Sequence, residues 1–152
     1  MLHYGEKSRQ VTALALLLCA ACLSAAPEAT AGSIRVAQAW SRPTPPVAAT
    51  GVAYLIITNL GIQADRLQSA ATPLAASAEI NETRHLHGVA QMRAVPSLEI
   101  PPGQTLRLEP GAWHIMLVNL VRPLSAGAEY PLTLTFRDAG TVTVLVKVRE
   151  QS

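Results

Sequence analysis

The chain has 152 residues, of which 49% are hydrophobic and 14% are charged, and its net charge is +2. This length and composition predict a single globular domain and exclude a disordered chain. A charge this small, with no run of basic residues, excludes nucleic acid as an expected partner.

The N-terminal segment has the pattern of a secretory signal peptide. Lys7 and Arg9 precede an apolar stretch over residues 11–26, and an A-x-A cleavage pattern follows at Ala29-Thr30-Ala31. Residues 1–31 are therefore predicted to be removed, and the protein is expected to be periplasmic or secreted. The apolar stretch is shorter than the about 20 residues that a spanning helix needs, so no membrane span is expected after cleavage.

Both cysteines lie inside this segment. Cys19 and Cys22 form a CxxC pair, but a discarded helix is a poor place for zinc or redox chemistry. Two alternatives stay open: a lipid anchor on Cys22, which follows Ala20-Ala21, and an earlier cleavage after Ala25 or Ala26. Cleavage after the A-x-A pattern leaves no thiol, so a metal site in the remaining chain has to use His, Met, carboxylate or backbone groups.

Residues 32–152 are predicted to form one all-β domain. Short β-branched or alternating runs are separated by Pro and Gly at fairly regular spacing, which is typical of a sandwich or barrel. In the first run Ile34, Val36 and Gln38 would share one face, and the run over residues 52–58 is almost continuously apolar, which predicts burial on both faces. The predicted strands cover residues 34–40, 52–58, 66–70, 76–83, 89–95, 98–100, 105–109, 113–120, 130–136 and 141–148.

Five side chains that can ligate a soft metal fall within 32 residues of this domain: His85, His87, Met92, His114 and Met116. His114 and Met116 are two residues apart on a predicted strand, so they share a face. Thioether and imidazole donors together favour copper, mainly Cu(I), over zinc or calcium. Methionine is also a common core filler, so spacing alone leaves a structural role equally open. No GxSxG, P-loop or GxGxxG motif is present, and an enzyme is not expected.

Several motifs together resemble the periplasmic copper-chaperone family of the PCu(A)C type. The resemblance covers nearly all of residues 34–148, and the family signature is H-x10-M-x21-H-x-M. In this chain 21 residues separate Met92 from His114, and Met116 completes H-x-M, whereas the first histidine of the signature falls on Asn81. The other landmarks are Ala39-Trp40-Ser41-Arg42, Gly51-Val52-Ala53-Tyr54-Leu55, Asp65-Arg66-Leu67, Ile100-Pro101-Pro102-Gly103, Leu108-Glu109-Pro110-Gly111 and Pro131-Leu132-Thr133-Leu134-Thr135-Phe136.

The resemblance implies a cupredoxin-like Greek-key β-sandwich that binds Cu(I), with Cu(II) as a second candidate. It also implies delivery to a copper-accepting protein, such as a cytochrome c oxidase subunit or another copper chaperone. Met92, His114 and Met116 would ligate the metal, and His85 or His87 would replace the imidazole missing at position 81. Two alternatives stay open: a weak three-ligand site, and a metal-free domain that acts as an interaction module.

Overall fold

The computed structural model describes residues 27–150, and the described chain is all-β. No helix in this part of the chain is long and apolar enough to cross a membrane. Its strands are β1 Glu28–Ala31, β2 Ile34–Ser41, β3 Thr50–Asn59, β4 Asp65–Ala71, β5 Ala75–Leu86, β6 Val89–Ala94, β7 Leu98–Ile100, β8 Thr105–Leu108, β9 Trp113–Leu120, β10 Glu129–Phe136 and β11 Gly140–Val148.

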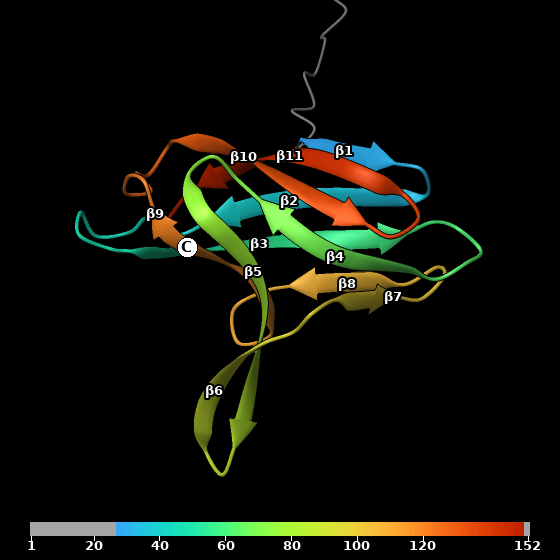
Figure 1. The fold of residues 1–152 in the computed structure, drawn as a ribbon, viewed down its shortest axis with the longest axis horizontal. Helices are drawn as coiled ribbons and strands as arrows, with labels where there is room; N and C mark the ends of the chain where they lie inside the picture. Colours follow the sequence, from blue (N-terminus) through green and yellow to red (C-terminus); the bar gives the residue numbers. More distant parts are fainter. Residues whose placement is uncertain (1–26, 151–152) are drawn as a thin grey trace, which may run out of the picture.

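The strands form one sheet that bends over on itself into a barrel-like sandwich, as predicted. The pairing order is β6-β5-β9-β8-β3-β2-β11-β10-β4-β7, with β1 beside β2 and a further pairing of β9 with β3. A single pair, Ala70 with Ala78, joins β4 to β5 and closes the ring. Figure 1 shows β4, β10 and β11 lying over β2 and β3. The core between these layers is mostly apolar, and its largest buried side chains include Ile57, Leu67, Ile115, Leu117, Tyr130, Leu132, Leu134 and Phe136.

Two details of the predicted strands are wrong. β3 is buried on both faces only in part: Ala53, Leu55 and Ile57 are buried in the core, whereas on the opposite face Tyr54 is buried and Ile56 is half-buried. Gln38 is exposed, because the register of β2 against β3 shifts between Ala37 and Trp40 at a β-bulge, where Gln38 has φ +53°.

The sequence did not predict β1, which lies inside the segment expected to be removed with the signal peptide. Its four residues pair antiparallel with β2, from Glu28 opposite Ala37 to Ala31 opposite Ile34. Ala29 and Ala31 pack against the core. Cleavage after Ala31 would remove this strand and expose the edge of β2, whereas an upstream cleavage would keep it.

A buried carboxylate fixes the turn between β10 and β11. Asp65 accepts hydrogen bonds from the backbone N–H groups of Arg66, Asp138 and Ala139, at 2.7, 3.0 and 2.9 Å. Burial alone would raise the pKa of Asp65, but these donors and the nearby Arg137 outweigh it, and the pKa lies below its ordinary value. The carboxylate therefore holds β4 against the β10–β11 hairpin in its charged form.

The β5–β6 hairpin projects from the body of the molecule (Figure 1). Six cross-strand pairs hold it together, from Asn81 opposite Ala94 to Leu86 opposite Val89. His87 and Gly88 form its two-residue turn with φ values of +52° and +78°, as a type I′ hairpin turn requires. All six residues of β6 are exposed. This hairpin begins where the candidate site lies.

Candidate metal centre

Asn81 and His114 stand directly opposite each other on neighbouring strands, at the base of the projecting hairpin. The register pairs Asn81 of β5 with His114 of β9 on one side and with Ala94 of β6 on the other. Both polar side chains are buried, with exposed fractions of 4% and 3%. Directly opposed residues have Cβ atoms about 5 Å apart, so the two side chains are neighbours on one face of the sheet.

The imidazole of His114 has one nitrogen held and one nitrogen free. Nδ1 lies 3.2 Å from the carbonyl oxygen of Ala112, and because a carbonyl can only accept, Nδ1 carries the hydrogen in this contact. The neutral ring then leaves Nε2 as an unprotonated lone-pair nitrogen. Nε2 is buried and has no hydrogen-bond partner among the described residues. Such a nitrogen is suited to bind a metal ion, and the Nδ1 contact orients it.

The Asn81 amide nitrogen, Nδ2, is the second buried polar atom here without a partner in the described chain. An unsatisfied buried polar group costs about 1–3 kcal/mol, and here two such atoms lie on directly opposed residues. Nδ2 is a donor only and does not ligate a cation. Position 81 therefore offers a hydrogen bond rather than a soft ligand.

The two methionines lie on the same face as His114, at different depths. Met116 is half-buried, two residues along β9, and is paired with Val52 and Glu79. Met92 pairs with Thr83, which lies two residues beyond Asn81, and its side chain is 63% exposed. From strand spacings, the backbone of Met92 is about 12 Å from that of His114. Its flexible thioether would have to turn inward to join the other donors.

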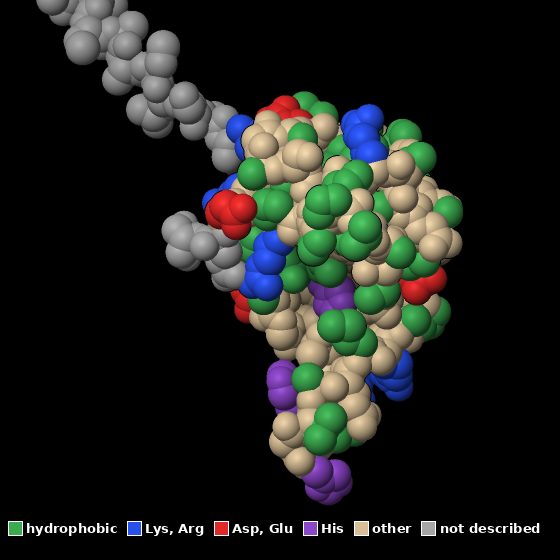
Figure 2. Space-filling view, turned by 90° about the vertical axis from the view of Figure 1, so that its left-hand side faces the viewer, with side chains coloured by type: hydrophobic (Ala, Val, Ile, Leu, Met, Phe, Trp, Pro, Cys, Tyr) green, Lys and Arg blue, Asp and Glu red, His purple; other side chains and the backbone are tan. Residues whose placement is uncertain are grey.

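The structure does not bring His85 and His87 to this position. They lie four and six residues beyond Asn81 along the hairpin, which is about 13 and 20 Å at strand spacing. Figure 2 shows histidine side chains along the projection and at its outer end. Their predicted role as a replacement ligand for position 81 stays a prediction, and it would require the hairpin to bend.

The remaining surroundings contain one group that the sequence did not single out. Glu79 is exposed and stands opposite Met116 on the same face, where its charge favours a cation. Only the register reveals this, since 37 positions separate the two residues in the chain. Within residues 27–150, no three His, Cys, Asp or Glu side chains converge on one point. A metal bound here therefore needs thioether ligands. Trp113 packs partly against the core.

Comparisons with known proteins match most of this chain to sequences described as putative lipoproteins. The profile of the family described as "Putative lipoprotein LpqE-like" matches residues 34–148. The protein described as "Putative lipoprotein Lxx21020", from Leifsonia xyli subsp. xyli (strain CTCB07), is 34% identical over 154 residues. This match covers 95% of this chain and 90% of that protein.

Solved structures of similar fold include copper-binding domains. The copper-bound PCuAC domain from PmoF2 superimposes with a TM-score of 0.69, covering 82% of this chain and 98% of that domain. Its sequence identity is 22%, so this similarity shows the shared fold. The solution structure of Cu(I)-DR1885 from Deinococcus radiodurans is 36% identical, with a TM-score of 0.63 and coverage of 80% of this chain and 79% of that one.

Proposed function

The chain belongs to the LpqE-like lipoprotein family, and from this membership and the geometry of its donors we propose that it is an exported carrier of Cu(I). His114, Met116 and Met92 bind the ion. The protein transfers it to a copper-accepting protein, such as a cytochrome oxidase subunit or another copper chaperone. It performs no catalysis.

The observation that carries this proposal is the free Nε2 of His114. The nitrogen is buried, its lone pair is available, and the Ala112 carbonyl fixes the ring. Burying an unpartnered polar group is unfavourable, so an apolar side chain at position 114 would make the metal-free protein more stable. A bound metal ion gives Nε2 a partner and removes this penalty, which contributes to the free energy of metal binding.

The other donors favour Cu(I) over harder cations. Met116 is half-buried on the same face, and Met92 supplies a second thioether from the hairpin. Soft sulfur ligands select Cu(I), whereas magnesium and calcium require oxygen ligands. The similarity to Cu(I)-DR1885 supports the same metal. A site without thiolate holds copper less firmly than cysteines would, which suits a protein that has to release its ion.

We place the protein outside the cytoplasm, with its signal sequence removed upstream of β1. The LpqE-like family and the Leifsonia relative are described as lipoproteins, which supports export. Cleavage before Glu28 keeps β1 paired with β2. Cys22 is the residue that would carry a lipid, and it lies outside the described residues. Mass spectrometry of the processed protein distinguishes a lipid on Cys22 from cleavage at residue 25, 26 or 31.

Anaerobic competition with a colorimetric Cu(I) chelator tests the proposal directly. We expect saturable one-to-one binding with a dissociation constant below micromolar at neutral pH. His114→Leu should abolish tight binding, and Met92→Leu and Met116→Leu should each weaken it. Ile56→Leu, a volume-conserving change elsewhere in the sheet, serves as the matched control. Wild-type protein that fails to bind one equivalent would refute copper carriage.

Asn81 supports a second candidate function, a metal-free or weakly metal-binding interaction module. The buried amide opposite His114 takes the place of a soft ligand, and its N–H could donate to Nε2 after a small side-chain rotation. In that case the pair would satisfy itself without metal. The Met92→Leu/Met116→Leu double variant discriminates between the two functions. Under this alternative, adding Cu(I) changes the melting temperature of neither the wild type nor the double variant.

A further inference from the structure

His85 and Met92 form a second pair of soft donors on the projecting hairpin. His85 is paired with Ala90 and Met92 with Thr83, so the two residues are diagonal neighbours on adjacent strands. Diagonal neighbours are about 7–8 Å apart at the backbone, which is within reach of long side chains. The backbone of Met92 is therefore closer to His85 than to His114.

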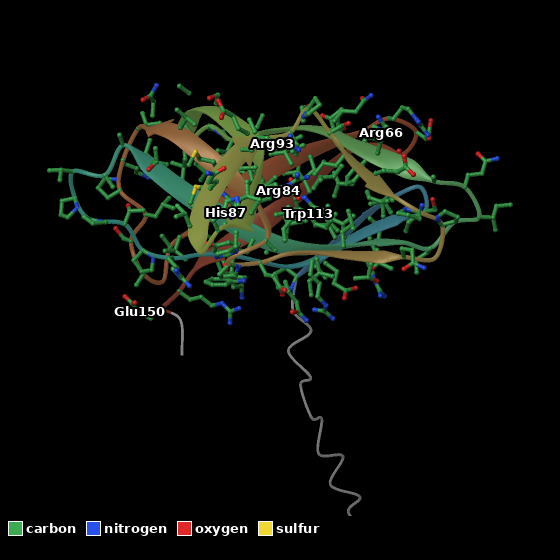
Figure 3. All side chains as sticks on the ribbon, turned by 90° about the horizontal axis from the view of Figure 1, so that it is seen from below. Arg66, Arg84, His87, Arg93, Trp113 and Glu150 are labelled. Atoms are coloured by element: carbon green, nitrogen blue, oxygen red, sulfur yellow. The ribbon has the colours of Figure 1, made fainter. Side chains whose placement is uncertain are left out.

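Both donors face away from the charged side of the hairpin. Side chains alternate along a strand, so His85, Thr83 and Met92 share one face with the small residues Ala90 and Ala94. The opposite face carries Glu82, which lies 2.7 Å from Arg84 and 3.6 Å from Arg93. Figure 3 shows Arg84 and Arg93 toward the same side of the hairpin. The two arginines of the hairpin, Arg84 and Arg93, therefore lie on the face opposite to His85 and Met92.

The two donors are also available to a ligand. Met92 is 63% exposed, and His85 is exposed too. Within the described chain, His85 has no hydrogen bond or ion pair that would hold its ring elsewhere. His87 differs, because it lies in the turn at the tip, outside the regular pairing of β5 with β6.

We propose that His85 and Met92 form an outer two-donor site through which Cu(I) enters and leaves the inner site at His114 and Met116. This inference rests on the proposed function. Met92 belongs to both sites, because it pairs with Thr83, midway along β5 between Asn81 and His85, and its three rotatable bonds allow its thioether to turn either way. One imidazole and one thioether suffice for weak Cu(I) binding, so the outer site is a transient position.

Transfer is then a ligand exchange without redox change. The bond between copper and the sulfur of Met92 persists throughout. The bonds from copper to His114 and Met116 break as the bond to a nitrogen of His85 forms, and copper stays Cu(I). The ion reaches an exposed position on a projection, where an acceptor's ligands can replace His85 and then Met92.

Transfer kinetics, measured apart from affinity, test this proposal on the full processed protein. The protein is loaded with one equivalent of Cu(I), and stopped-flow absorbance follows transfer to an excess of a colorimetric chelator. We expect His85→Ala to slow transfer about tenfold while the equilibrium dissociation constant changes less than twofold. His85→Met should restore the rate, because it restores a soft donor at the same position. His87→Asn is the matched control, since asparagine tolerates the positive φ of the turn, and should change neither quantity.

Silver provides a direct binding measurement. In the His114→Leu variant, which lacks the inner site, Ag(I) should shift the NMR signals of the His85 ring and the Met92 methyl group together, and not those of His87. Ag(I) shifts of Met92 without His85 would overturn the proposal, as would an unchanged transfer rate in His85→Ala. A tenfold loss of affinity in His85→Ala would instead make His85 an inner ligand and would also overturn it. Absence of Cu(I) binding to wild-type protein would refute the proposed function itself, and the outer site with it.

Discussion

Replacing His114 by leucine should stabilise the metal-free protein, although the residue is almost fully buried. The substitution removes the Nδ1 hydrogen bond to Ala112, which is worth about 1 kcal/mol. The Ala112 carbonyl does not become unsatisfied, because it also accepts the backbone N–H of Thr83 at 3.1 Å. The substitution also removes the unpartnered Nε2, whose burial costs about 1–3 kcal/mol. Since leucine has a similar volume, the net gain is about 1 kcal/mol.

Metal should reverse this order of stability. A ligand that binds only the folded state at 100 times its dissociation constant stabilises it by about 2.7 kcal/mol. Wild type gains this stabilisation from metal binding and His114→Leu does not. Wild type therefore becomes the more stable protein when Ag(I) or Cu(I) is added. For a domain of this size, 1 kcal/mol corresponds to a melting-temperature shift of roughly 3–6 °C.

Thermal and urea unfolding, followed by circular dichroism with and without Ag(I), measure both effects. Met116→Leu is the matched control on the same strand. It should lose the increment from metal, but it removes no buried unsatisfied nitrogen and should change the metal-free stability by less than about 1.5 kcal/mol. If metal-free His114→Leu is less stable than wild type by more than about 1 kcal/mol, Nε2 already has a partner and is not available to bind a metal ion.

Three further predictions concern other contacts. Asn81→His should tighten Cu(I) binding about tenfold or more in a chelator competition, since it adds a soft donor directly opposite His114; unchanged affinity would show that position 81 does not reach the ion. Asp65→Asn should cost about 1.5–3 kcal/mol at pH 7, because a charged acceptor of three backbone N–H groups is lost. The lowered pKa of Asp65 contributes stability above its unfolded value near 3.8, and this is lost as the pH falls further. The difference in free energy of unfolding between wild type and Asp65→Asn, measured with urea, should therefore narrow below about pH 4. A difference that stays constant with pH would contradict the role of Asp65 as a charged acceptor. Tyr130→Phe should cost about 1–2 kcal/mol by leaving the buried Ser41 hydroxyl unpartnered, and adding Ser41→Ala should cost less than the sum of the single changes. Burial raises the pKa of Tyr130 to about 12, so wild-type stability should fall as the pH rises from about 10 towards 12, and Tyr130→Phe should lose this dependence.

The strands could be predicted from the sequence because each is encoded by consecutive residues. Alternation over Leu132, Leu134 and Phe136 identifies β10, and these same side chains are buried in the core. β1 was missed for a reason in its own residues. Small alanines at positions 29 and 31 satisfy both a signal-peptidase pattern and a short edge strand, and local sequence does not distinguish the two.

The sequence by itself determined the donor types, their spacing and the all-β class, because these depend on residue identity and on short-range alternation. Only the tertiary structure decided which donors share a site. It placed Asn81 opposite His114, 33 positions away in the chain, and left a polar atom of each without a partner. It also moved His85 and His87 out along a hairpin. The register between distant strands depends on which segments pair and where each turn falls, and short-range alternation does not encode this. The extension of β5 into the hairpin is enough to place His85 and His87 too far from His114 to share its metal ion.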